Sequence, residues 1–316
     1  MSEAILPSWR PSPTRDALLA FLQAAEAVAV SDRVAYFDND GTLWCERPTY
    51  VQYDFFADEL RRRTAVDPAV AERPEFAAVL AGDSARIAEL GLPRIAIALA
   101  DLFAGLTPEE FTDRVRDFAG RMSHPVLGHR LADLRYLPML ELIHELRQRE
   151  FTVGIVTGGG ADFLRAISAE LYEVAPELVV GTLIEHELGR TAAGAPELRR
   201  TTRLIGGANE GPAKVTNIQT QLGRRPLLAA EFAGCDLAVL DPPRVGAVEQ
   251  VREIAAARVP KVIYAACSPE TFARDARHLV DGGLELRELR PIDQFLYAAE
   301  VELVALFARP DAAKRP

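Results

Sequence analysis

Cysteine is scarce in this chain of 316 residues, and positive charge is outnumbered by negative charge. Only three cysteines occur, and no two of them share a C-x-x-C spacing. Neither a disulfide framework nor a zinc site is therefore expected. The 36 Lys and Arg residues are outnumbered by 46 Asp and Glu residues, which gives a formal net charge of −10. That charge opposes a general affinity for the phosphates of nucleic acid, so nucleic acid is not an expected partner.

Long apolar runs are also missing. The best candidate, IAIALADLFAGL, is interrupted by Asp101 and falls short of the roughly 18 residues that span a bilayer. The first residues, MSEAILPSWRPSP, lack the basic stretch and apolar core of a secretory signal. We therefore expect a cytoplasmic protein with reduced cysteines and no membrane partner.

Strand-like and helix-like segments alternate over most of the chain. The segment RVAYFDNDGTLW begins with a short apolar run that ends in a polar turn, which is typical of a buried strand. Residues 45–135 are mostly helical in pattern, with Thr107 and Glu110 placed as a capping box. Beyond them, strands and helices alternate again. This order predicts an α/β protein with parallel sheets flanked by helices.

Two carboxylates, Asp38 and Asp40, lie in the turn FDNDGT that follows the first predicted strand. Carboxylates so close repel each other, and a divalent cation would relieve that repulsion. Mg²⁺ suits carboxylate and phosphate oxygens together. Asp38 could attack phosphorus and form an aspartyl-phosphate, while Asp40 protonates the leaving oxygen and later activates water.

Two further groups suit a phosphoryl ligand. Thr157 ends the segment TVGIVT and precedes Gly158, Gly159 and Gly160, so its hydroxyl and nearby backbone N–H groups could hold phosphate oxygens. Lys214 starts a predicted helix and could neutralise charge on the transferring group. The simpler alternatives are an ordinary turn rich in Asp, Asn and Gly, and a lysine on a helix surface.

Residues 14–230 resemble the haloacid dehalogenase-like hydrolases through FDNDGTLW, the threonine of IVTGGG and Lys214 in GPAKVTNI. The segment YLPMLELIHELRQREFTVGIVTGGGADFLR is similar to phosphoserine-phosphatase-like members. Members that transfer phosphate carry the second aspartate, here Asp40. The resemblance therefore implies a Mg²⁺-dependent hydrolase that acts on a small phosphorylated substrate.

The same resemblance implies a domain organisation. The expected architecture is a three-layer core with a parallel sheet, built from residues 1–44 and 136–230. Residues 45–135 would be a helical cap inserted after the first strand, and such a lid excludes water and shapes specificity.

The fourth motif of the family is altered in this chain. After the predicted strand PLLAA, family members carry glycine, a small polar residue and acidic metal ligands, whereas this chain has EFAGCDLAVL. Asp236 is the candidate metal ligand beside Asp38 and Asp40, and Glu231 is a second candidate. Only six residues separate PLLAA from LAVLD. We expect these strands to be antiparallel or to belong to separate units, because a parallel crossover needs a dozen or more residues.

A second set of chemically suggestive residues lies in the last segment, 231–316. A thiolate at Cys267 could attack C6 of a uracil ring, and Glu302 could later remove the C5 proton. Asp241 with two prolines makes a stiff loop. LAVLDPPRVGA, VIYAACSPETFARDARHL and PIDQFLYAAEVELVALF resemble the C-terminal part of the RNA uracil-C5 methyltransferases, which use S-adenosylmethionine. This implies a partial Rossmann-like fold of order β-α-β-α-β-β.

Three functional interpretations follow. We favour a Mg²⁺-dependent phosphatase with Asp38 as nucleophile. The second is an S-adenosylmethionine-dependent RNA methyltransferase, although no cofactor-binding half precedes residue 232 and the last segment carries 11 basic against 14 acidic residues. The third is a non-catalytic chimera of two partial domains, in which Cys267 is a small buried residue at a strand end.

Overall fold

The computed structural model describes residues 5–11, 13–224, 226–229, 237–240, 246–256, 259–266, 268–292 and 302–310. The chain forms two compact units. Unit 1 contains Met1–Trp44, Tyr136–Val156 and Glu210–Pro316, and unit 2 contains Cys45–Arg135 and Thr157–Asn209. No helix in the described part of the chain combines the length and apolarity needed to cross a bilayer.

Unit 1 is built on a sheet whose strands run in the order β2-β1-β5-β6-β7-β9-β8. The pairs from β2 through to β7 are parallel, and β9 and β8 are antiparallel to their neighbours. The strands are β1 (Val34–Phe37), β2 (Thr152–Gly160), β5 (Leu228–Ala229), β6 (Leu237–Leu240), β7 (Lys261–Ala266), β8 (Glu285–Ile292) and β9 (Glu302–Ala308).

Strand β1 lies inside this sheet and is buried along its whole length. It pairs with β2 from Val34 opposite Thr152 to Phe37 opposite Ile155, and with β5 on its other side. A four-residue apolar strand between two parallel neighbours is the pattern expected of a fully buried position. The polar turn beginning at Asp38 therefore starts at the carboxyl end of a central strand.

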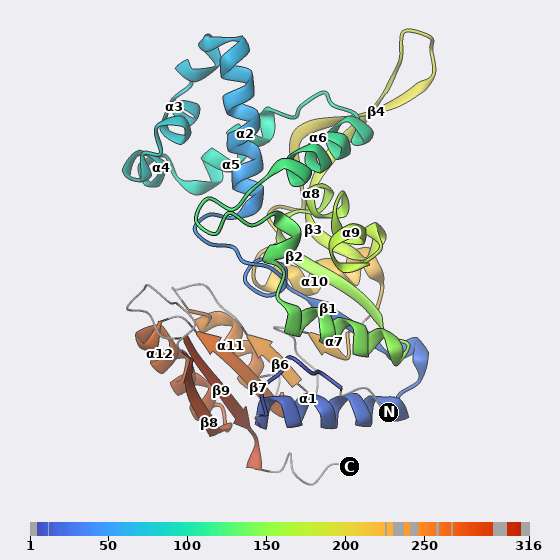
Figure 1. Ribbon diagram of the computed structural model, residues 1–316, viewed down its shortest axis with the longest axis vertical. Coiled ribbons are helices and arrows are strands. Elements are labelled where there is room, and N and C mark those ends of the chain that lie inside the picture. Colours follow the sequence, from blue (N-terminus) through green and yellow to red (C-terminus); the bar gives the residue numbers. More distant parts are fainter. Residues whose placement is uncertain are drawn as a thin grey trace. The chain divides into compact units, whose positions relative to one another are not determined.

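The helices of unit 1 complete the α/β pattern. They are α1 (Pro13–Ala24), α7 (Leu137–Gln148), α10 (Pro212–Leu222), α11 (Val248–Ala256) and α12 (Pro269–Asp281), with short 3₁₀ turns at Ala25–Ala27 and Val30–Asp32. Figure 1 shows α11 and α12 side by side next to strands β6 to β9, and α12 contacts β7, β8 and β9. The α/β class and the β-α-β-α-β-β order predicted for the last segment are both confirmed.

The expectation for β5 and β6 was wrong. They lie in one sheet and are parallel neighbours, although they pair at a single position, Ala229 with Ala238. The usual crossover length assumes a helix that returns along a full strand. A return along a strand of four residues covers only about 13 Å. The number of residues between β5 and β6 is sufficient for that distance, because a chain can reach roughly 3.3 Å per residue.

Unit 2 combines a helical block with a long β-hairpin. Its helices are α2 (Val51–Val66), α3 (Pro74–Ala81), α4 (Ser84–Leu90), α5 (Leu92–Asp101), α6 (Pro108–Arg121), α8 (Ala161–Arg165) and α9 (Ser168–Tyr172), with 3₁₀ turns at Pro68–Glu72, Leu131–Leu134 and Pro176–Leu178. Strands β3 (Val179–Arg190) and β4 (Pro196–Ile205) form an antiparallel hairpin, which extends well beyond the helices of this unit in Figure 1.

An aromatic cluster around Phe55 holds the helices of unit 2 together. The Phe55 ring on α2 stacks on Phe103 at 4.9 Å between centroids, and contacts the rings of Phe111 and Phe118 on α6. It also contacts Phe163 on α8, at 5.4 Å. Buried aromatic pairs in such offset and edge arrangements add to the energy of simple burial. The cluster therefore ties α8, which follows the Thr157 turn, to α2.

The predicted capping box at the start of α6 is confirmed. The Thr107 hydroxyl accepts a hydrogen bond from the Glu110 backbone N–H at 3.2 Å, and the Glu110 carboxylate accepts one from the Thr107 N–H at 2.8 Å. Two donors that an isolated helix leaves unpaired are thereby satisfied.

Candidate active site

The structure brings two of the sequence-predicted residues, Asp38 and Lys214, into contact in unit 1. Asp38 follows β1, and Lys214 lies in the first turn of α10. The Lys214 Nζ lies 3.3 Å from the Asp38 Oδ1, and their side chains are 11% and 25% exposed. A partly buried ion pair at this separation is screened less than a surface pair. The lysine therefore holds positive charge directly beside the proposed nucleophile.

The turn after Asp38 is fixed by its own hydrogen bonds. The Asn39 carbonyl accepts from the backbone N–H groups of Thr42 and Leu43, and the Gly41 N–H donates to the Trp44 carbonyl at 3.0 Å. Gly41 has a φ of 76°, a left-handed conformation that glycine adopts without strain. These bonds and the conformation of Gly41 fix the backbone of the turn that contains Asp40.

The side chain of Asp40 has a defined orientation. Its Oδ1 accepts a hydrogen bond from the Trp44 indole Nε1–H at 2.8 Å. Trp44 is itself 1% exposed and is among the largest fully buried side chains of the protein. A buried indole therefore restricts the orientation of this carboxylate. Nothing in the pattern FDNDGTLW alone indicated that the tryptophan would take this role.

Glu210 is a third carboxylate at this site, and sequence reasoning missed it. It lies just before α10 and interacts electrostatically with both Asp38 and Lys214. Glu210 is exposed. The protein around it nevertheless raises its pKa by desolvation; Lys214 lowers this pKa, and Asp38 raises it. Its position four residues before Lys214 is the signal that could have identified it.

The oxygen donors of this turn suit a divalent cation in part. Asp38 and Asp40 offer carboxylates, and the buried Asn39 has an Oδ1 without a hydrogen-bond partner among the described residues. No cluster of three or more acidic, histidine or cysteine side chains suited to a metal occurs in the described part. Asp236, the predicted third ligand, and Glu231, its alternative, lie outside the described residues.

The predicted phosphate turn, Thr157 to Gly160, forms the last part of β2 and belongs to unit 2. The Gly159 N–H donates to the Thr157 hydroxyl at 3.0 Å. The Gly160 N–H donates to the Gln52 side-chain oxygen at 2.8 Å. Helix α8, which follows, has only five residues. The two N–H groups are thus already engaged, and the Thr157 side chain is buried.

Two more residues that the sequence did not single out donate side-chain hydrogen bonds to the backbone carbonyls of this turn. The Asn209 Nδ2 donates to the Thr157 carbonyl at 2.8 Å, and the Thr182 hydroxyl donates to the Gly158 carbonyl at 2.7 Å. Asn209 is fully buried. At Gly181, a Cβ would come within 3.0 Å of the backbone of Ala161 and of the Gly159 carbonyl, so β3 can approach the turn only through a glycine.

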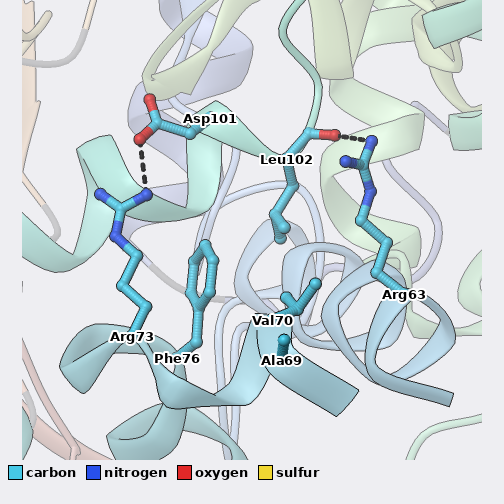
Figure 2. A pocket seen from close by; sticks show the side chains of 7 residues that line it. All are labelled: Arg63, Ala69, Val70, Arg73, Phe76, Asp101 and Leu102. Atoms are coloured by element: carbon cyan, nitrogen blue, oxygen red, sulfur yellow. Dashed lines mark hydrogen bonds and ion pairs between the residues drawn. The ribbon is translucent and has the colours of Figure 1, made fainter. Parts of the chain in front are cut away.

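A cavity of about 300 Å³ lies elsewhere in unit 2 (Figure 2). Two arginines stand on opposite sides of an apolar floor, and each is tied to a neighbour. The Arg73 Nη1 donates to the Asp101 Oδ2 at 2.7 Å, and the Arg63 guanidinium donates to the Leu102 carbonyl. None of the sequence-predicted site residues lines the cavity, whose walls are Arg63, Ala69, Val70, Arg73, Phe76, Asp101 and Leu102.

Most of the residues predicted for uracil chemistry lie outside the described part of the chain. Asp241 and Cys267 are among them, and Glu302 is described only as the first backbone position of β9. The described residues show a different feature of this segment, a buried carboxylate at Asp275. It accepts hydrogen bonds from the Ala247 N–H and the Tyr264 hydroxyl, both at 2.5 Å, and from the Arg274 Nε at 2.9 Å.

The Asp275 network keeps its tyrosine protonated. Burial raises the pKa of the Tyr264 phenol, and the neighbouring Asp275 carboxylate raises it further. The hydroxyl therefore remains a donor at any ordinary pH. Gly246, with a φ of 82°, lies so close that a Cβ would come within 2.5 Å of the Asp275 carboxylate. This network attaches Ala247, just before α11, to Asp275 in α12, and its role is to stabilise the fold.

Comparison with known proteins identifies two relationships. A family model described as haloacid dehalogenase-like hydrolase matches residues 35–237, which is more than half of the chain. A conserved, functionally unknown protein from Anaerococcus prevotii has a similar structure, with a TM-score of 0.50 and 13% identity over 77% of this chain and 89% of that one. At this identity the likeness concerns the fold alone.

The curated relatives that match the chain are RNA methyltransferases. An uncharacterized RNA methyltransferase of Caulobacter vibrioides is 46% identical over 115 residues, which are 36% of this chain and 28% of that protein. A second, from Mesorhizobium japonicum, is 42% identical over 125 residues, 40% of this chain and 29% of that protein. The chain thus spans less than a third of the length of these relatives, and combines similarity to both groups.

Proposed function

Because the chain belongs to the haloacid dehalogenase-like hydrolases, we propose that it hydrolyses phosphate monoesters of small molecules through an aspartyl-phosphate on Asp38, with Mg²⁺. The observation that carries this proposal is the pair formed by Asp38 and Lys214 at the end of β1, 3.3 Å apart. The nearby Asp40 carboxylate, oriented by Trp44, supplies an acid and base at the same turn.

In the first half-reaction an Asp38 carboxylate oxygen attacks phosphorus, and the bond from phosphorus to the leaving oxygen breaks. Asp40, protonated at that moment, gives its proton to the leaving oxygen. In the second half-reaction Asp40 takes a proton from water, which attacks the phosphorus of the aspartyl-phosphate and frees Asp38 and inorganic phosphate. Throughout, the Lys214 ammonium offsets negative charge that develops on the phosphoryl oxygens.

Mg²⁺, when bound, neutralises part of the charge shared by the carboxylates and the phosphoryl group. We assign its binding to the Asp38 carboxylate and the Asp40 backbone carbonyl, with Asp236 as a further ligand. Thr157, Gly158 and Gly159 are assigned to the phosphoryl oxygens because they form the carboxyl end of β2. The general rule that α/β sites gather beyond the carboxyl ends of strands supports this assignment.

The direct test is hydrolysis of a generic aryl phosphate by the full chain, with Mg²⁺ and with excess chelator. Turnover that requires Mg²⁺ and returns when the ion is restored would support the proposal. Absence of turnover under both conditions would favour the non-catalytic chimera, in which the altered segment 231–236 fails to complete the metal site.

Replacement of Lys214 by Met should lower kcat/KM for an aryl phosphate by roughly 10²- to 10³-fold, the range seen when one group that stabilises transition-state charge is removed. Methionine keeps the apolar stem in its buried position and removes only the charge. Steady-state kinetics would measure the change. The same substitution at Lys261, which lies at the start of β7, is the matched control and should leave kcat/KM unaltered.

A second candidate function is RNA uracil methylation with S-adenosylmethionine, favoured by the 46% identity to an RNA methyltransferase. Its residues would be Asp241, Cys267 and Glu302. Binding of radiolabelled S-adenosylmethionine to the full chain is the discriminating measurement. We expect no saturable binding, because the sheet half that precedes the matching strands carries the hydrolase pattern instead. Saturable binding would restore this candidate.

A further inference from the structure

Gln52 reaches the phosphate turn from α2, within unit 2. Its carboxamide lies directly over Gly159 and Gly160. A Cβ added to Gly159 would come within 2.6 Å of the Gln52 Oε1, and one added to Gly160 within 2.8 Å of the Gln52 Nε2. Two consecutive glycines thus leave the space that this one side chain fills. The absence of a side chain at Gly159 and Gly160 therefore allows the Gln52 amide to pack against this turn.

The orientation of the Gln52 amide follows from its partner. A backbone N–H can only donate, so the group that faces the Gly160 N–H at 2.8 Å must be the carbonyl oxygen. The Nε2 end then points away from that bond and carries two N–H donors. Among the described residues, no acceptor takes either of them. Gln52 is half-buried, so the donors are close to the turn and still within reach of a ligand.

The Thr157 hydroxyl belongs to the same local arrangement. Its Oγ1 would lie 3.3 Å from a Cβ on Gly159, the atom that would also collide with Gln52. Because the hydroxyl accepts from the Gly159 N–H, its proton is left for another acceptor. The Gln52 Oε1 and the Thr157 hydroxyl thus lie beside Gly159, while the donor end of the amide, Nε2, lies beside the next residue, Gly160. An oxyanion is the chemical group that takes several such donors at once.

We propose that Gln52 is a substrate-binding residue of unit 2, whose Nε2 donates to a phosphoryl oxygen held at the Thr157 turn. The inference rests on the proposed function for the identity of the anion. It assigns to α2 a direct part in recognising the phosphoryl group itself, in addition to any role of this helical block in covering the substrate. The Oε1 bond to Gly160 holds the amide in place while the Nε2 binds.

The test uses the full chain labelled with ¹⁵N and inorganic phosphate as the probe. In the wild type, the side-chain NH₂ signal of Gln52 and the amide signals of Gly159 and Gly160 should shift saturably as phosphate is added. Gln52→Glu keeps the length and the acceptor oxygen, and replaces the donors by negative charge. We expect it to weaken phosphate binding by about 10-fold or more, the range for hydrogen bonds to charged groups.

A second variant, Gln52→Met, separates loss of the donors from charge repulsion. It should weaken phosphate binding as well, to a smaller extent. Gln148→Glu places the same new charge at the exposed end of α7 and is the matched control. Thermal unfolding of each variant checks the fold. Phosphate affinity in Gln52→Glu and Gln52→Met within two-fold of wild type would overturn the assignment.

Kinetics distinguish failure of this inference from failure of the hydrolase proposal. If aryl phosphate is hydrolysed, both Gln52 variants should raise KM more than they lower kcat, because the contact exists in the bound ground state. Turnover with an unchanged KM would remove Gln52 from the site and leave the hydrolase in place. Phosphate binding that depends on Gln52 without any turnover would contradict the hydrolase and leave the anion site in place.

Discussion

Replacement of Asp38 by Asn should reduce hydrolysis of an aryl phosphate by about 10⁴-fold or more, as expected when a nucleophile that acts within a set of groups is removed. An amide cannot form the acyl phosphate, and it also takes one charge from any bound cation. Steady-state rates at saturating Mg²⁺ would measure the loss. Acid quenching with ³²P-labelled substrate should trap label on the wild-type chain and none on the variant.

The matched control for this change is Asp32→Asn, in the short 3₁₀ turn before β1. It removes one carboxylate from the same region and should keep wild-type activity. Asn is close in shape to Asp, so the Asp38 variant should stay folded, although Lys214 loses one of its charged neighbours. Retained turnover in Asp38→Asn, or label trapped on it, would contradict the assignment of Asp38 as nucleophile.

Replacement of Asp275 by Ala should lower the free energy of unfolding of unit 1 by about 2–5 kcal/mol, because each buried donor left without its acceptor costs about 1–3 kcal/mol. The Ala247 N–H and the Tyr264 hydroxyl would both lose their acceptor, and the partly exposed Arg274 would lose one ion-pair partner. Donors left unsatisfied in the interior retain their full desolvation cost. Urea unfolding followed by circular dichroism, with hydrogen exchange in β7 and α12, would measure the loss.

Asp281→Ala is the control for this prediction. Asp281 lies on the same helix and pairs with Arg277, but both side chains are more than half exposed. Exposed pairs of this kind contribute about 0–1 kcal/mol. A small and similar effect of both substitutions would mean that the Asp275 network contributes little to stability. Aryl phosphate hydrolysis should persist in the Asp275 variant below its unfolding temperature, because none of these residues belongs to the proposed site.

The parts of the fold that sequence predicted well are those with strong local signals. Strand β1 combines four apolar residues with a turn that contains two aspartates and a glycine at positive φ, and each feature points to the same boundary. The start of α6 has Thr107, Pro108 and Glu110 in the order of a capping box. Residues close together in the sequence determine both the end of β1 and the start of α6, so a short window of sequence is enough to predict them.

Other features depend on partners that are distant in the chain. The segment GADFLRAISAELY (160–172) has the apolar spacing of one helix, whereas the structure has α8 and α9 separated at Ile167, whose φ of −126° is not helical. No glycine or proline marks that break. The role of Gln52 was missed for a similar reason. On α2 it resembles any polar helix residue, and only the tertiary fold shows that it meets Gly160.

The candidate site was predictable in composition and only in part in geometry. Asp38 and Lys214 were named from their motifs, and the structure places them 3.3 Å apart. Glu210 carries no motif of its own and emerges only because the loop before α10 returns to the end of β1. The parallel pairing of β5 with β6 was excluded by a rule on connection length, which assumes longer strands than these two.

The sheet of unit 1 has a consequence for how proteins can be assembled in evolution. Strands β1 and β5, from the hydrolase pattern, and β6 to β9, from the methyltransferase pattern, share one continuous ladder of backbone hydrogen bonds. Backbone N–H and C=O groups are the same in every sequence. An unpaired strand edge can therefore pair with a strand of unrelated origin without a matching set of side chains. A recombined gene can in this way yield an ordered polypeptide before selection has refined the seam.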